Sequence, residues 1–84
     1  MGRELRRHPR RKVSTDATIA FADGLTLSCK VKDISESGAL LMLPNDTELP
    51  FDFILAIGNN GTVRRTCYVV RQEGRKVGVR FPNR

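Results

Sequence analysis

Two short groups of polar residues carry the side chains that could do chemistry in this chain. Arg6 and Arg10 are four residues apart, with Arg7 between them. In an extended segment, that spacing places two guanidinium groups on one side, roughly 13 Å apart. Such groups bind phosphates bidentately, contact the O6 and N7 acceptors of guanine, or stack on a purine ring. The first group therefore predicts a site for an anion or a nucleotide.

The second group consists of Asp33, Ser35 and Gly38, in the pattern Asp-x-Ser-x-x-Gly. A carboxylate accepts hydrogen bonds from the N1 and N2 groups of guanine, a hydroxyl donates or accepts, and glycine lets a backbone approach a ligand closely. The same residues also suit an ordinary polar turn, in which Asp33 and Ser35 bind nearby backbone amides and Gly38 has a positive φ. Taken alone, the pattern favours the ordinary turn.

The positive charge of the chain is concentrated at its N-terminus. The 84 residues have a formal net charge of +6, and residues 1–12 contain six Arg or Lys side chains against one Glu. The rest is nearly neutral, which favours a local anion site or a basic arm over a surface that coats nucleic acid. Gly2, Pro9 and the repelling arginines predict that this arm is extended and flexible without an anion. A solubilising tail is the alternative.

Residues 13–84 predict one all-β domain. Six segments are apolar or alternate between apolar and polar residues, as strands with a buried face do. These segments are residues 13–21, 25–32, 39–43, 51–57, 62–73 and 76–81. Short turns with Asp-Gly or Asn-Gly separate several of them, and no segment has a helical period. We expect a six-stranded antiparallel β-barrel, because closure removes exposed strand edges.

The alternation also assigns side chains to the core. Leu25 begins the inward face of the second segment, and Asp33 ends that segment in phase with the same face. Phe51 begins the inward face of the fourth segment. Cys29 and Cys67 lie in strand-like segments, and the favoured interpretation is two reduced core thiols, with a disulfide between them as the alternative.

The sequence disfavours an enzyme. His8 is the one histidine and lies in the basic arm, and no serine has a base at a catalytic spacing. No cluster of metal ligands and no glycine-rich nucleotide loop is present. A long apolar run and a charged-then-apolar leader are also absent, so neither a membrane span nor a signal peptide is expected. A non-catalytic binding protein of the cytoplasm is therefore expected.

Together, the two groups resemble the signature of the PilZ domain family, which is Arg-x-x-x-Arg followed by Asp/Asn-x-Ser-x-x-Gly. The Cys67–Arg71 and Val77–Phe81 segments also resemble the last strands of that family. The resemblance covers roughly residues 4–82. It implies a six-stranded barrel that binds the bacterial second messenger cyclic di-GMP, with no metal or other cofactor.

The resemblance also implies roles for the site residues. The arm binds the phosphates and guanine edges through Arg6 and Arg10, with Arg7 beside them, and becomes ordered over the ligand. The turn holds a guanine on the barrel surface through Asp33, Ser35 and Gly38. The C-terminal helix of many members is not expected here. A stand-alone domain without an attached output domain is expected, so the signal is expected to pass to a partner protein.

Two matters stay open at this point. Arg7 and Arg11 also fit the first motif. In the family that the chain resembles, the residue before this motif influences how many ligand molecules bind. By that resemblance, Leu5, which precedes the preferred register, implies one bound ligand, and Arg6, which precedes the other register, implies two. The alternative functions are a small nucleic-acid-binding barrel, with Tyr68 for base stacking, and a protein–protein adaptor that has lost the ligand.

Overall fold

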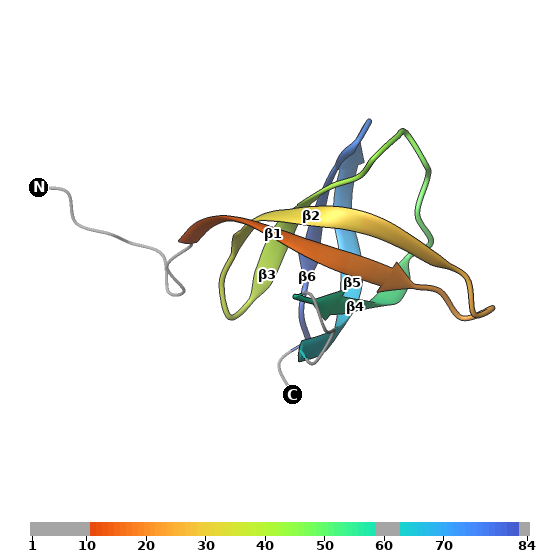
Figure 1. Ribbon diagram of the computed structural model, residues 1–84, viewed down its shortest axis with the longest axis horizontal. Coiled ribbons are helices and arrows are strands. Elements are labelled where there is room, and N and C mark those ends of the chain that lie inside the picture. Colours follow the sequence, from red (N-terminus) through yellow and green to blue (C-terminus); the bar gives the residue numbers. More distant parts are fainter. Residues whose placement is uncertain (1–10, 59–62, 83–84) are drawn as a thin grey trace, which may run out of the picture.

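The computed structural model describes residues 11–58 and 63–82, which form six β-strands (Figure 1). The strands are β1 (Arg11–Ala20), β2 (Thr26–Ile34), β3 (Gly38–Met42), β4 (Asp52–Ile57), β5 (Val63–Glu73) and β6 (Lys76–Arg80). Every neighbouring pair is antiparallel, and the order β1-β2-β3-β6-β5-β4 closes into a barrel. The predicted six-stranded antiparallel barrel is confirmed. The arm expected to be flexible lies outside the described residues, apart from the start of β1.

The core fills the inside of the barrel with apolar side chains from all six strands. Its largest fully buried members are Ile19, Leu41, Leu43, Leu55, Val31, Val77 and Cys67. No polar or charged residue of the described part is buried. Burial of each such side chain stabilises the fold by about 1.5–3 kcal/mol. The alternation seen in the sequence therefore favours closure of the barrel around an apolar interior.

Two apolar residues assigned to the core by alternation lie on the surface instead. Leu25 is 66% exposed and Phe51 is 69% exposed, and each lies just before its strand begins. The Leu25 N–H donates to Asp23 Oδ1 (3.0 Å) and its carbonyl accepts from the Phe21 N–H (2.9 Å). Phe51 packs on Tyr68, with the ring centroids 5.3 Å apart. Hydrogen bonds of the turn, and a neighbouring ring, orient these two side chains.

Cys29 and Cys67 are buried free thiols, so the interpretation as two core thiols is confirmed. Burial raises the pKa of Cys29 to about 11. Burial, and then the nearby Cys29, raise the pKa of Cys67 to about 12, against a smaller opposing effect of Arg65. Both thiols therefore stay protonated and unreactive at neutral pH.

Tight turns join several of the strands. Gly24 has a φ of 94° between β1 and β2, and Gly74 has a φ of 62° between β5 and β6. Glycine adopts this region without strain. The Asn-Gly turn expected at residues 58–61 lies largely outside the described residues. The described residues contain no helix, and hence none that could cross a membrane.

Candidate functional site

An irregularity in β2 turns Asp33 outward. Val31 pairs with Leu41, but the next pair is Asp33 with Leu40, so β2 has one extra residue at this point. Leu41 is buried, whereas Leu40 is half-buried on the outer face. Because directly paired residues share a face of the sheet, Asp33 lies on the outer surface. The expectation that Asp33 continues the inward face is wrong. The bulge keeps its carboxylate out of the apolar core, where burial of a charge would be costly.

Ser35 begins the loop between β2 and β3. Its N–H donates to the Gly38 carbonyl (2.9 Å), so only Glu36 and Ser37 lie between the paired residues. Ser35 Oγ accepts the Ser37 N–H (3.2 Å) and lies 3.1 Å from Ser37 Oγ, where either hydroxyl can donate. The Ser35 hydroxyl thus stabilises its own turn, as in the ordinary-turn interpretation.

Gly38 allows two strands to approach closely. Its φ is not positive, so the ordinary-turn interpretation is wrong on this point. An ideal Cβ on Gly38 would lie 2.3 Å from the Val79 carbonyl oxygen and 3.4 Å from the Arg80 Cα. The Phe81 N–H donates to the Ser37 carbonyl (2.8 Å) and holds the end of β6 against the loop. The glycine of the motif therefore serves the contact between β3 and β6.

Asp33 belongs to a row of outward residues that continues across β3, β6 and β5. Leu40 pairs with Gly78, and Gly78 pairs with Arg71. These three residues, together with Glu73 and Lys76, line a hollow of about 220 Å³. The nearest atom to an ideal Cβ on Gly78 is 4.0 Å away, so the missing side chain leaves the floor of the hollow open. Arg71 Nε lies 3.5 Å from Glu73 Oε2, and both side chains are exposed.

Leu40, Gly78 and Arg71 belong to neither sequence motif and were not among the predicted site residues. A glycine inside a strand often marks a close approach of a ligand. The position of Gly78 inside a predicted strand is therefore a sequence signal for the site. The sequence held no such signal for Arg71, because strict alternation from the buried Cys67 would point its side chain inward. The register shift between Val69 and Arg71 reverses its direction.

The first strand begins beside the Asp-x-Ser-x-x-Gly turn. Arg11 pairs with Ile34 and Lys12 pairs with Asp33, and Figure 1 shows β1 and β2 running side by side. The basic arm therefore joins the barrel next to Asp33, at the end of the β1–β2 pair that carries the turn. Three predicted site residues precede this point and lie outside the described residues: Arg6, Arg7 and Arg10.

The outer face near the turn combines several recognition groups. A half-buried carboxylate, that of Asp33, and a half-buried hydroxyl, that of Ser35, can bind the polar edge of a base. Arg80 pairs with Gly38 and is exposed, as is Arg71, so guanidinium groups are available nearby. In the described ranges, no group of three or more potential ligands could hold a metal ion. This set suits a flat, polar and anionic molecule.

Comparison with known proteins finds a family that covers nearly the whole chain. A family model described as the PilZ domain matches residues 4–84. The matched range includes the basic arm, the Asp-x-Ser-x-x-Gly turn and all six strands. No curated protein shows significant similarity to the chain.

Proposed function

The chain belongs to the PilZ domain family of cyclic di-GMP receptors, and we propose that it binds cyclic di-GMP without catalysing a reaction. We further propose that it is an adaptor that signals to a partner protein. The observation that carries the proposal is the pairing of Arg11 with Ile34 and of Lys12 with Asp33. Because Arg10 is bonded to Arg11, the arm joins the barrel beside Asp33, which supports a shared site for the two halves of the family signature.

In this proposal, the turn binds one guanine. The Asp33 carboxylate accepts hydrogen bonds from the guanine N1 and N2 groups, and Ser35 exchanges its bond with Ser37 for one with the ligand. The half-buried state of Asp33 and Ser35 supports this assignment, since partial exclusion of water strengthens such hydrogen bonds while access remains. Gly38 keeps the loop against β6 and so fixes the position of both side chains.

The arm supplies the positive charge in this proposal. Each phosphodiester of the ligand carries one negative charge, which Arg6, Arg7 and Arg10 can bind bidentately. Closing the arm over the ligand changes the surface that a partner protein meets, and this change is the proposed signal. Ordering the arm costs conformational entropy, so the affinity is lower than the contacts alone imply.

The hollow over Gly78 is the proposed floor for a purine ring. Leu40 contributes an apolar wall, and the open position at Gly78 lets a flat ring lie against the backbone. Arg71 lies at the edge of this hollow, where a guanidinium can stack on the ring. The row from Asp33 through Leu40 and Gly78 to Arg71 would then bind opposite parts of one nucleotide.

A cytoplasmic location is part of the proposal. Cys29 and Cys67 are both unpaired, which is usual where cysteines are kept reduced. The nucleic-acid alternative is less well supported. Tyr68 is the strand residue best suited to base stacking, but it is half-buried and packs on Phe51.

Titration calorimetry of the full chain with cyclic di-GMP tests the proposal. We expect binding by the wild type, and a loss of roughly 10- to 100-fold in affinity for Arg10→Ala, because a hydrogen bond to a charged group contributes about 1.5–3 kcal/mol. Arg64→Ala is the matched control, since Arg64 is exposed on β5 opposite Ala56 and carries the same charge. The proposal fails if the wild type releases no heat, or if both variants lose the same affinity.

A further inference from the structure

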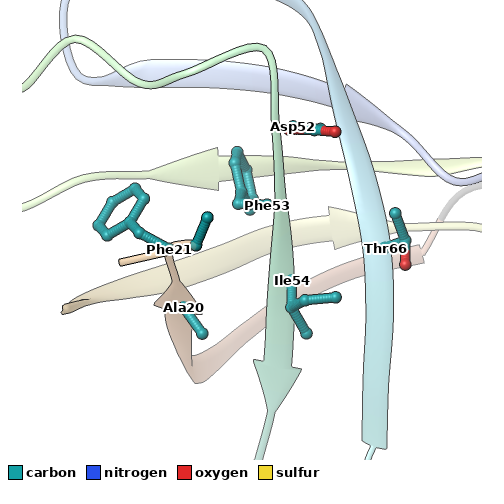
Figure 2. Close-up of a pocket in the computed structure, with 7 residues that line it drawn as sticks. Ala20, Phe21, Asp52, Phe53, Ile54 and Thr66 are labelled. Atoms are coloured by element: carbon teal, nitrogen blue, oxygen red, sulfur yellow. The ribbon is translucent and has the colours of Figure 1, made fainter. Parts of the chain in front are cut away.

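A groove runs between the end of β1 and the start of β4. It consists of two adjoining hollows, of about 230 Å³ and about 400 Å³, whose walls share Phe21, Ala22 and Asp52. Figure 2 shows the first hollow, with the rings of Phe21 and Phe53 on one side of β4 and Asp52 at the start of that strand. Pro50 extends the apolar wall into the second hollow. We refer to this surface as the β1–β4 groove.

The charge of the β1–β4 groove is opposite to that of the protein. Among the described residues in its walls, the charged ones are Asp23 and Asp52. Both are exposed, and neither forms an ion pair with another described residue. Asp23 Oδ1 accepts the Leu25 N–H (3.0 Å), as a turn aspartate does. In a chain with a net charge of +6, this groove attracts cations and repels phosphates.

Two exposed apolar residues lie close in sequence to the walls of the groove. Leu25 follows the turn that contains Ala22 and Asp23 and is 66% exposed. Phe51 lies between Pro50 and Asp52 and is 69% exposed. Apolar surface of this kind, bordered by polar groups, is typical of places where another protein binds.

We propose that the β1–β4 groove is a docking site for a partner-protein segment in which a lysine or arginine lies beside apolar side chains. The apolar side chains and the aliphatic stem of the cation pack against Phe21 and Pro50, and its charged end pairs with Asp23 or Asp52. This proposal names the partner chemistry for the proposed adaptor function. It does not require cyclic di-GMP, so its test uses the ligand-free protein.

The β1–β4 groove and the motif lie on one continuous row of paired residues. Asp52 pairs with Tyr68, Tyr68 with Arg80, and Arg80 with Gly38. Three such steps across neighbouring strands span roughly 14 Å. The groove shares no lining residue with the Asp-x-Ser-x-x-Gly motif. A segment in the groove and a ligand at the motif can therefore be bound together.

An NMR titration of the full chain tests this proposal. The probe is a capped peptide of sequence Ala-Lys-Phe-Arg-Leu-Lys-Ala, and the control is the same peptide with glutamate at its three cationic positions. We expect the cationic peptide to shift the amide signals of Ala20, Ala22, Asp52 and Ile54. The acidic peptide should leave them unchanged. The double variant Asp23→Asn, Asp52→Asn should bind the cationic peptide about three- to tenfold more weakly, because exposed ion pairs contribute modestly.

The choice of variants separates charge from folding. Asparagine at position 23 keeps the side-chain oxygen that accepts the Leu25 N–H, so the turn is retained. Asp46→Asn is the matched control, since Asp46 is exposed and lies outside the groove walls. The proposal is overturned if millimolar cationic peptide causes no shift, or shifts spread over the whole surface. It is also overturned if the double variant binds as tightly as Asp46→Asn, or if the groove signals depend on protein concentration without peptide, which would indicate a second copy of this chain.

Discussion

Gly38 lies against the Val79 carbonyl oxygen, so close that a Cβ at position 38 would be 2.3 Å from that oxygen. Real Cβ atoms are not found at such a distance from a backbone oxygen, and a backbone atom cannot rotate away as a side chain can. The last position of the Asp-x-Ser-x-x-Gly motif is thus coupled to the pairing of β3 with β6. The turn that carries Asp33 and Ser35 is held in place by this packing.

Replacing Gly38 with alanine should destabilise the barrel. The added methyl group forces β3 away from Val79, and overpacking of this kind costs about 1–3 kcal/mol. Urea unfolding followed by circular dichroism should show a lower midpoint with an unchanged slope. A variant as stable as the wild type would show that the contact between β3 and β6 relaxes without cost.

Replacing Gly78 with alanine should leave the stability nearly unchanged but weaken ligand binding. An ideal Cβ there has no neighbour closer than 4.0 Å, so we expect a stability change within about 0.5 kcal/mol. The new methyl group occupies the hollow beside Leu40 and Arg71. Titration calorimetry should then show that the affinity for cyclic di-GMP falls by roughly tenfold or more. Unchanged affinity in a folded variant would remove this hollow from the proposed site.

Alanine at position 10 or 11 should distinguish the two registers of the arginine motif. In the preferred register, Arg10 binds the ligand, so Arg10→Ala weakens binding by about 10- to 100-fold. Arg11→Ala should weaken it much less, because Arg11 is then a strand residue that pairs with Ile34. The same titrations should give one ligand per chain. A larger loss of affinity for Arg11→Ala than for Arg10→Ala, with two ligands bound per chain, would favour the register of Arg7 and Arg11.

Alkaline pH should destabilise the fold through the two buried thiols. The ordinary pKa of a cysteine is 9.0, and burial raises it to about 11 for Cys29 and about 12 for Cys67. Well below pH 9, the thiols are protonated in both the folded and the unfolded state, and they do not make the stability depend on pH. As the pH rises from 9 toward 12, the unfolded chain loses these protons first, so the free energy of unfolding falls.

Urea unfolding at pH 8 and pH 10 measures this effect. At pH 10 the loss should be about 1 kcal/mol for each thiol. The free energy of unfolding of the double variant Cys29→Ala, Cys67→Ala should fall correspondingly less between the two pH values, even if this variant is less stable at both. An equal loss in the wild type and the double variant would assign the alkaline effect to other groups.

Several features of the fold could be predicted from local patterns. The six strands and most of the core followed from alternation, because burial of one face of a strand imposes a period of two residues. Errors arose where that period is interrupted. Leu25 and Phe51 lie just outside their strands. Asp33 and Arg71 lie beyond bulges, and one extra residue reverses the direction of every side chain that follows until the register is restored.

The sequence by itself determined the fold class, the family and the residue types of both halves of the signature, because these depend on local periodicity and on short motifs. Only the tertiary structure decided which faces of the barrel the described site residues occupy. The two bulges place Asp33 and Arg71 on one outer row with Leu40 and Gly78. Barrel closure brings Gly38 against Val79. Pairing between strands distant in sequence sets these relations, and no local period encodes them.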